Sequence, residues 1–189
     1  GSGIAGLSNL NKDYLGYIIR NLEELDAIAD TIIVDTGAGI SDAVLEFLVA
    51  SGEILLVTTP EPTSITDSYS LLKALNRHPR FSSEASRIKV IANKVSSQEE
   101  GEILFGKLNA VVSGYLKLPI VYLDAVPDDT QLSQAVMQQM PVSLQSPQAK
   151  SALAFEKIAE KLMNIEKDQK VQKRGMAAFF SHIVNGKKI

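Results

Sequence analysis

The chain has 189 residues, 45% of them hydrophobic and 22% charged, values ordinary for a globular protein with a sizeable core. It has no cysteine, which excludes disulfides, thiolate metal sites and iron–sulfur ligation. Its two histidines, His78 and His182, lie far apart in the sequence, so a histidine-based metal site is not expected. The sequence contains no run of 18 apolar residues, so it predicts no membrane-spanning helix.

The net charge of −3 is unevenly distributed along the chain. Residues 165–189 hold six basic residues against two acids, a balance of +4, so the first 164 residues carry −7. An acidic body does not favour general affinity for nucleic acid, whereas a basic tail favours an anionic surface. We therefore predict no specific nucleic-acid partner.

Hydrophobic patterning predicts strands that alternate with helices. In chain order, the expected elements are a helix after an Asn11 cap that reaches Ile28, a strand at 31–35, a helix at 41–50, a strand at 53–59, a helix at 64–75, a strand at 87–93, a helix at 98–115, a strand at 120–124, a helix at 130–139, a loop at 141–146 and a helix at 147–163. The strands are continuous apolar runs, which is typical of strands buried on both faces. The predicted fold class is α/β, with a doubly wound, mostly parallel sheet and helices on both faces.

The most informative stretch is residues 31–40 (TIIVDTGAGI), where a β-branched run ends at Asp35 and a turn with Gly37, Ala38 and Gly39 follows. Ligands collect at the carboxyl ends of parallel strands. A carboxylate there can hold Mg²⁺ through water, and a glycine turn lets the backbone approach a phosphate. The alternative is a plain turn, in which Asp is common. We predict that Asp35 is a catalytic, Mg²⁺-linked acid, although the lysine loop that accompanies it in nucleotide hydrolases, GxxxxGK[ST], does not occur in this sequence.

Polar or turn-forming residues also follow the other predicted strands. Asn93 offers a donor and an acceptor to a base edge, although it could simply end its strand. Pro127 and Asp128 follow the last strand, where a plain turn is the alternative. Three further residues occupy a loop and the first turn of the next helix, which indicates either a partner surface or a solvated helix start: Glu61, Ser64 and Asp67.

The tail carries an apolar stripe at positions i, i+3, i+4, i+7 and i+8, formed by Met176, Phe179, Phe180, Ile183 and Val184. Basic pairs at 173–174 and 187–188 bracket this stripe. Such a helix can lie in a membrane interface with its cations near anionic headgroups. The alternative is a last helix docked on the core. We favour the membrane because a charged stretch separates the stripe from the body.

Together, these motifs resemble the MinD/ParA group of deviant-P-loop ATPases, and within it the FlhG (YlxH, FleN) branch that regulates flagellar number and placement. The resemblance rests on residues 35–41 (DTGAGIS), 58–67 (TTPEPTSITD), 93–94 (NK), 126–129 (VPDD) and 146–150 (SPQAK), and it runs over essentially the whole chain. It implies that residues 1–163 are the C-terminal part of a MinD-like ATPase domain, 164–174 a charged linker and 175–189 an amphipathic membrane-targeting tail.

The resemblance also implies a role for each candidate residue. Asp35 would be the Walker B acid that holds Mg²⁺ through water, and residues 37–39 would be the switch II segment near the γ-phosphate. Asn93 would contact adenine, with Pro127 and Asp128 lining the base pocket. Glu61, Ser64 and Asp67 would lie near the dimer and partner surface, and the tail stripe would face the membrane. The implied ligands are ATP and Mg²⁺. The implied partners are a second copy in the ATP state, a flagellar GTPase, C-ring components and an anionic membrane. The implied location is the inner face of the cell membrane, on the cytoplasmic side.

One large departure from the family is the absence of the KGGxGKT loop, which its amino-terminal third carries. The first three residues, Gly-Ser-Gly, resemble a glycine turn found mid-protein in that branch, so we expect a truncated chain, although Gly-Ser is also compatible with a cloning scar. We expect this chain alone to hydrolyse no ATP and to bind it weakly. The alternatives are a cell-division MinD, a ParA partition ATPase, or a non-catalytic module that keeps the fold and the partner surface.

Overall fold

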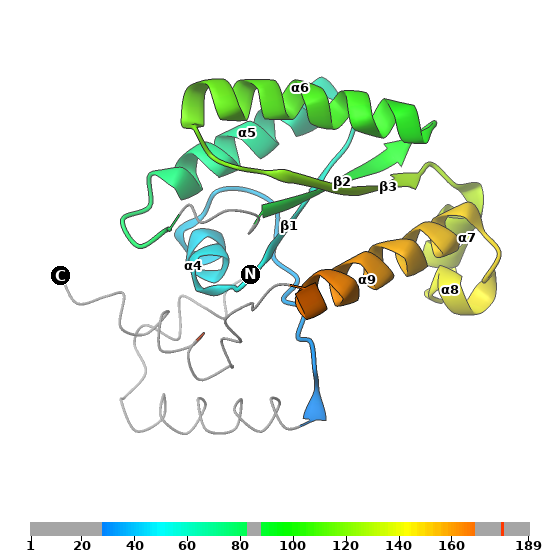
Figure 1. The fold of residues 1–189 in the computed structure, drawn as a ribbon. Coiled ribbons are helices and arrows are strands. Elements are labelled where there is room, and N and C mark those ends of the chain that lie inside the picture. The colour runs from blue at the N-terminus through cyan, green and yellow to red at the C-terminus, as the bar shows by residue number, and fades with distance from the viewer. Residues whose placement is uncertain (1–27, 83–87, 169–178, 180–189) are drawn as a thin grey trace. The chain divides into compact units, whose positions relative to one another are not determined.

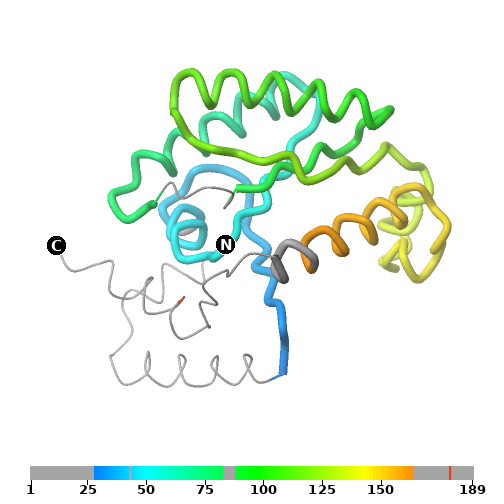
Figure 2. The backbone as a smooth tube through the Cα atoms, in the orientation of Figure 1, coloured from blue at the N-terminus to red at the C-terminus, as the bar shows by residue number. Residues whose placement is uncertain are grey.

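The computed structural model describes residues 28–82, 88–168 and 179, and the chain path can be followed in Figure 2. The chain divides into two compact units, which we treat separately. One comprises residues 1–53, 73–82 and 172–189, and the other comprises residues 54–72 and 83–171. The sheet and all but the last four residues of the helices that cover it belong to the second unit.

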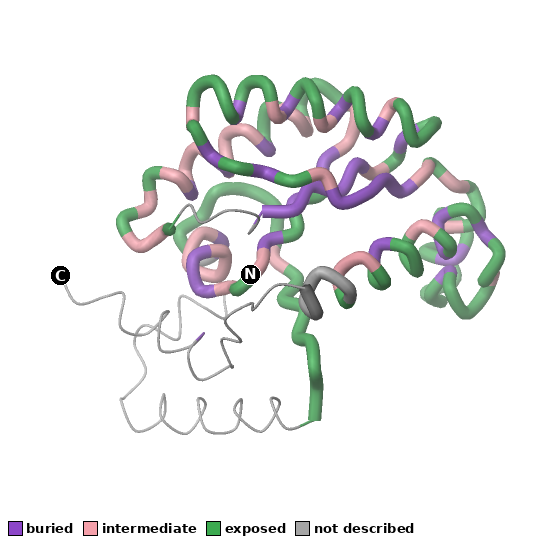
Figure 3. The backbone as a smooth tube through the Cα atoms, in the orientation of Figure 1, coloured by how far each residue is buried: buried purple, intermediate pink, exposed green. Residues whose placement is uncertain are grey.

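The sheet contains three parallel strands, β1 (Ile54–Thr58), β2 (Ile88–Val95) and β3 (Val121–Pro127), in the order β1-β2-β3. Most of β2 and much of β3 are buried, as Figure 3 shows in purple. This burial on both faces is what their uninterrupted apolar runs predict. The α/β fold class with a parallel sheet is therefore confirmed, and so are three of the four predicted strands.

Helices cover both faces of this sheet (Figure 1). On one face, α6 (Gln98–Leu116) packs Leu104 against Ala92 and Ala125, and Ile65 of α5 (Pro62–Asn76) joins the same cluster. On the opposite face, α9 (Lys150–Asp168) packs Ile158 against a cluster of strand residues, namely Ile91, Leu123 and Val126. Two short helices, α7 (Thr130–Met137) and α8 (Val142–Gln145), connect β3 to α9. In the first unit, α4 (Asp42–Ala50) begins after Ser41, whose Oγ accepts a hydrogen bond from the backbone N–H of Val44 at 3.5 Å.

The structure corrects the predicted strand at residues 31–35. This segment is not part of any strand in the described region, and its apolar side chains face solvent, with Ile33 80% exposed. A strand needs a neighbour for its backbone hydrogen bonds, and none of the described strands pairs with this segment. The β-branched composition therefore favours an extended backbone here without providing a sheet.

Element boundaries differ elsewhere as well. The predicted loop at 141–146 contains the single turn of α8. The last described helix, α9, begins at Lys150 and continues to Asp168, so it includes the first residues of the predicted linker. The predicted helix before Ile28 lies outside the described residues.

Gly101 allows α6 to approach the sheet closely. A Cβ at this position would lie 2.9 Å from the Cβ of Ala125 and 2.7 Å from Oη of Tyr122. We expect Gly101→Ala to lower the free energy of unfolding by about 1–2 kcal/mol, because overpacking outweighs the better helix propensity of alanine. The matched control is Gly106→Ala on the same helix, where a Cβ would have no atom within 4 Å and should slightly stabilise the protein. Urea unfolding of both variants measures the difference, and equal effects would contradict the close-packing account.

Candidate functional site

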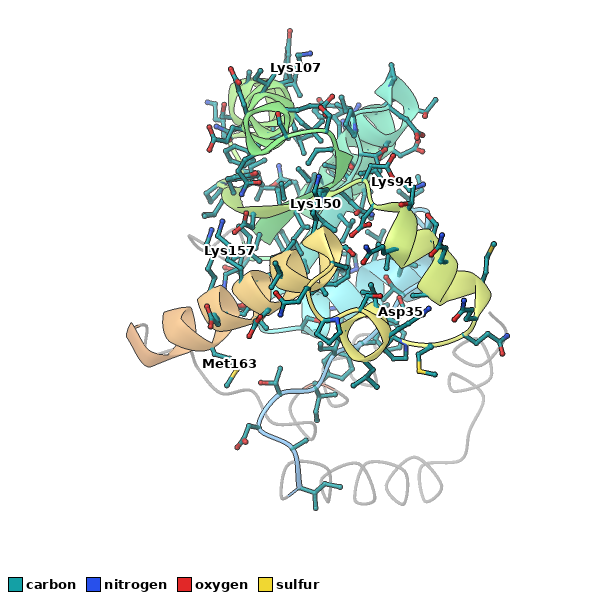
Figure 4. All side chains as sticks on the ribbon, turned by 90° about the vertical axis from the view of Figure 1, so that its right-hand side faces the viewer. Asp35, Lys94, Lys107, Lys150, Lys157 and Met163 are labelled. Atoms are coloured by element: carbon teal, nitrogen blue, oxygen red, sulfur yellow. The ribbon has the colours of Figure 1, made fainter. Side chains whose placement is uncertain are left out.

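The structure brings Asn93, Pro127 and Asp128 together at the carboxyl ends of β2 and β3. The strand register places Asn93 opposite Val126, and the backbone N–H of Asp128 donates to the carbonyl oxygen of Val95 at 2.9 Å. Figure 4 looks onto this end of the sheet, with Lys94 labelled where β2 ends. Lys94 has a left-handed φ of 55° and coincides with a register shift between Asn93 and Val95. This bulge lies one residue before the end of β2, directly after Asn93.

Asn93 is half-buried, and its Oδ1 accepts a hydrogen bond from the backbone N–H of Lys94 at 3.0 Å. That bond orients the side-chain amide and leaves its NH₂ group to serve as a donor. Asp128 is exposed directly across the strand end. An oriented amide beside a proline and a carboxylate is a group of the kind that reads the edge of a base.

The carboxyl end of β1 holds a second polar cluster. Oγ of Ser64 lies 3.2 Å from Oγ1 of Thr58 and accepts a hydrogen bond from the backbone N–H of Thr59 at 3.0 Å. The hydroxyl of Thr59 is buried and has no hydrogen-bond partner among the described residues. Of the three residues predicted for the partner surface, Glu61 and Asp67 are exposed, whereas Ser64 is partly buried in the first turn of α5 and contacts the end of β1.

Asp35 and residues 37–39 belong to the first unit. The side chain of Asp35 is exposed, and the turn that follows contains Gly39 with φ of 106°, a backbone conformation that L side chains rarely adopt. A glycine at this position is therefore required by the turn itself. Ser41 then caps α4, so the turn leads directly from the acid to the start of a helix.

Asp129 is a positioning residue that the strand-end pattern alone did not single out. It caps α7 by accepting a hydrogen bond from the backbone N–H of Gln131 at 2.9 Å. Its other carboxylate oxygen accepts from both the N–H and the Oγ of Ser151 at 3.0 and 2.9 Å. The hydrogen bonds from the backbone of Ser151 and of Gln131 lower the pKa of the Asp129 carboxyl. These bonds hold the start of α9 against the loop that contains Asp128. In the sequence, the pattern that indicates the cap is an Asp directly before a helical run.

A buried carboxylate, Asp124, joins β3 to both layers of helices. Its Oδ2 lies 2.7 Å from Nζ of Lys161 and 3.1 Å from Nζ of Lys157, both on α9, and the side chain of Gln98 at the start of α6 also donates to it. Lys161 additionally donates to the carbonyl oxygen of Leu123 at 2.9 Å, next to a register shift between β2 and β3. Sequence reasoning did not identify Asp124 as an ion-paired residue, because it lies in an apolar strand and its partners are distant in the chain.

The ionisation of Asp124 makes a testable contribution to stability. Burial raises the pKa of its carboxyl, but the bonds from Lys161, Ala125, Lys157 and Gln98 outweigh burial and lower the pKa to about 2. Because the folded-state pKa is depressed, the contribution is complete above about pH 4 and is lost as the pH falls through 2. We expect Asp124 to contribute at most about 2 kcal/mol to the free energy of unfolding. The actual contribution is smaller, because solvent screens the two partly exposed lysines.

The measurement compares Asp124→Asn with the unsubstituted chain by urea unfolding across this pH range. The difference in free energy of unfolding between them should shrink as the pH falls from about 4 to 2. A difference that does not depend on pH would show that Asp124 acts by packing alone.

Phe179 is the one residue of the predicted membrane stripe that the structure describes. It is 6% exposed, and its ring stacks on that of Phe47 in α4, with 5.7 Å between centroids and 24° between planes. Both residues belong to the first unit. The other four stripe residues, Met176, Phe180, Ile183 and Val184, lie outside the described residues. In the part of the chain that is described, no helix combines the length and apolar character needed to cross a membrane.

The described residues suit some parts of a nucleotide and metal site and not others. They contain no group of three or more His, Asp or Glu side chains able to hold a metal by themselves. Mg²⁺ does not need such a group, since it is usually bound by one or two carboxylates together with water and substrate phosphates. Asp35 offers one exposed carboxylate in the first unit and Asn93 one oriented amide in the second, and their roles toward Mg²⁺ and a base stay predictions. The backbone loop and lysine that grip phosphates are not in this sequence.

No family model matches the chain, but comparison with known proteins finds relatives of the kind that the motifs predict. The antiactivator FleN of Pseudomonas aeruginosa is 37% identical over 161 residues, which covers 85% of this chain and 56% of FleN. The flagellum site-determining protein YlxH of Helicobacter pylori is 30% identical over 158 residues, covering 82% of this chain and 52% of YlxH. A chloroplastic MinD homologue from Arabidopsis thaliana is 28% identical over 80% of this chain.

The chain thus spans about half the length of the curated relatives it matches. The matches run across the segments that carry the strand-end residues, since each covers at least 80% of the 189 residues. Together with the parallel α/β sheet, they confirm the resemblance seen in the motifs. Over the aligned part of the chain, the protein is therefore similar to FleN, YlxH and MinD, which are the relatives that its motifs indicated.

Proposed function

We propose that this chain is the C-terminal part of a MinD-like ATPase that regulates flagellar number and placement. The observation that carries this proposal is the gathering of Asn93, Pro127 and Asp128 at one end of a parallel sheet, in a chain whose relatives include a flagellum site-determining protein. Ligands of parallel α/β proteins bind at that end. A cell-division MinD is the second candidate, because a MinD homologue matches 80% of the chain at lower identity.

In this proposal each residue has a limited physical task. Mg²⁺ bound with ATP would neutralise charge on the β- and γ-phosphates during phosphoryl transfer. Asp35 would hold a metal-bound water, and the turn at residues 37–39 would bring backbone close to the terminal phosphate. Asn93 would donate to the adenine edge, with Pro127 and Asp128 beside it. Asp129 would keep this loop in register with α9 through its bonds to Ser151.

The proposed cycle alternates between an ATP-bound dimer and an ADP-bound monomer, with a flagellar GTPase and C-ring components as partners and the inner face of the cell membrane as its surface. Glu61 and Asp67 are exposed at the start of α5 and are available to a partner. Membrane binding through the tail stripe requires that Phe179 leave its stacked position on Phe47. The tail would therefore exchange a protein contact for a lipid contact.

Isothermal titration calorimetry with ATP and Mg²⁺ tests the nucleotide part of the proposal on two proteins. A longer protein that carries this segment together with a GKGGxGKT-type loop should bind ATP, and Asn93→Ala should weaken that binding by about ten-fold, the loss of roughly one good hydrogen bond. The 189-residue chain alone should bind weakly, because converging N–H groups and a lysine supply most of the phosphate affinity. Micromolar or tighter binding by the short chain would contradict this assignment.

A further inference from the structure

The strand end that leads to Pro127 and Asp128 is supported by the sheet on one side only. Strand β3 lies at the edge of the described sheet, so β2 is its one strand neighbour in the described part of the chain. The pairing of these two strands is also irregular beside the site, with a register shift between Asn93 and Val95. The other side of β3 must therefore be held by contacts other than strand pairing.

Helix α9 supplies such contacts just before the site. Leu123 has no partner residue in β2, because the register skips it, and its carbonyl oxygen accepts a hydrogen bond from Nζ of Lys161 at 2.9 Å. The next residue, Asp124, has its Oδ2 2.7 Å from Nζ of Lys161 and 3.1 Å from Nζ of Lys157. These bonds hold β3 to α9 three residues before Pro127.

The same carboxylate also holds the connection that follows Asn93. Gln98, five residues after Asn93, is the first residue of α6, and its side-chain amide donates to Oδ1 of Asp124. The side chain of Asp124 is 2% exposed, so water competes little for these bonds. Hydrogen bonds to a charged acceptor are also stronger than those to a neutral one. Asp124 therefore links β3, the start of α6 and the middle of α9.

A second carboxylate makes an equivalent link on the other side of Pro127 and Asp128. Asp129 accepts hydrogen bonds from the N–H and the hydroxyl of Ser151, which is fully buried in the first turn of α9. Its other oxygen accepts from the backbone N–H of Gln131 in α7. Pro127 and Asp128 thus lie between two acids that are each bonded to α9. We call this set of contacts the two-acid brace, formed by Gln98, Asp124, Asp129, Ser151, Lys157 and Lys161.

We propose that the two-acid brace positions the base-binding residues, so that Asn93 and Asp128 keep a fixed separation before a nucleotide binds. This inference rests on the proposed role of these residues in binding adenine. They come from different strands, and a binding group must be held within about 0.5 Å of its productive geometry to contribute fully. A preformed site also loses less conformational entropy when its ligand binds. Members of the brace are positioning residues and make no contact with the nucleotide.

A comparison of two ligands separates positioning from general stability. The longer protein, with its GKGGxGKT-type loop, is titrated with ATP and with inorganic tripolyphosphate in the presence of Mg²⁺. Asp129→Ser keeps a cap for α7 but is too short to reach Ser151, and it should weaken ATP binding about three- to ten-fold. Lys161→Met removes Nζ and keeps an apolar stem, and it should have the same effect. Tripolyphosphate binding should not change, because this ligand has no base.

Ser97→Ala and Lys107→Met are the matched controls for these two variants. Ser97 caps α6 beside the site through a bond from the backbone N–H of Glu100, and Lys107 is an exposed lysine on α6. Neither residue belongs to the brace, so both variants should bind ATP and tripolyphosphate like the unsubstituted protein. Brace variants that weaken both ligands equally, or neither, would overturn the proposal.

Amide hydrogen exchange of the 189-residue chain, followed by NMR, tests the brace without a nucleotide. The N–H of Asp128 donates to the carbonyl oxygen of Val95, and Val90 is a fully buried strand residue whose amide reports global unfolding. In Asp129→Ser and Lys161→Met, the amide of Asp128 should exchange at least about ten-fold faster relative to that of Val90. The two controls should leave this ratio unchanged.

The exchange result and the Asn93→Ala titration together distinguish failure of the brace from failure of the base assignment. An unchanged exchange ratio in the brace variants would overturn the brace, even where Asn93→Ala weakens ATP binding and so supports the base assignment. A raised ratio in a protein whose ATP affinity is indifferent to Asn93→Ala would overturn the base assignment, and with it the role of the brace in nucleotide binding.

Discussion

Replacing Asp35 with alanine in the longer protein should reduce Mg²⁺-dependent ATP turnover by at least about 100-fold, because charge stabilisation by the metal is the main catalytic contribution in phosphoryl transfer. The fold should be unaffected, because the Asp35 side chain is exposed and contributes nothing to the core. Steady-state phosphate release measures the turnover, and thermal unfolding checks the fold.

Asp42→Ala is the matched control for this substitution. Asp42 is also an exposed acid, seven residues further on in the first turn of α4, where its charge is favourable to the helix dipole. Its replacement should leave turnover near that of the unsubstituted protein. Near-normal activity in Asp35→Ala would show that Asp35 is merely a turn residue, whereas equal losses in both variants would point to a general effect of acid removal.

Phe180→Glu should reduce binding to anionic vesicles by at least about ten-fold, since it places a charge in the apolar stripe of the tail. Each apolar side chain contributes about 1–2 kcal/mol when buried, and each flanking cation adds roughly 1 kcal/mol near a negative leaflet. Ordering a short helix takes back much of this gain. Vesicle co-sedimentation should therefore show binding that requires anionic lipid and weakens with salt.

The stacked pair of Phe47 and Phe179 provides a second variant with the opposite expected sign. Phe47→Ala removes an aromatic contact of about 0.5–1.5 kcal/mol that competes with the membrane, so vesicle binding should become about 2- to 10-fold tighter. Tyr115→Glu, an exposed aromatic replacement on α6 with the same charge change as Phe180→Glu, should have no effect. If neither Phe180→Glu nor Phe47→Ala changed vesicle binding, the tail would be a permanently docked helix.

Several features of this protein follow from the sequence alone because they depend on local chemistry. Continuous Ile, Val and Leu runs predicted β1, β2 and β3 as parallel strands, and Ser41 predicted the start of α4. The expected burial on both faces holds for most of β2 and β3 but not for β1, where Leu55 and Val57 are exposed. The turn after Asp35 required glycine, and Gly39 has the positive φ that explains it. The strand-end motifs resemble those of the MinD/ParA group, in agreement with the similarity to FleN and YlxH.

Other features depend on partners distant in the chain, and only the tertiary structure decided them. Residues 31–35 have the composition of a strand, but pairing depends on a neighbour, and none is present among the described strands. Asp124 looks like an interruption of an apolar strand until Lys157 and Lys161, more than thirty residues later, are seen to neutralise it. The pattern at residues 130–139 likewise predicted a helix, but it did not predict the turn of α8 within the expected loop, nor that small residues of these two helices would be buried and large ones exposed. Side-chain periodicity indicates that a face is apolar, and only the packing of the whole chain decides what covers it.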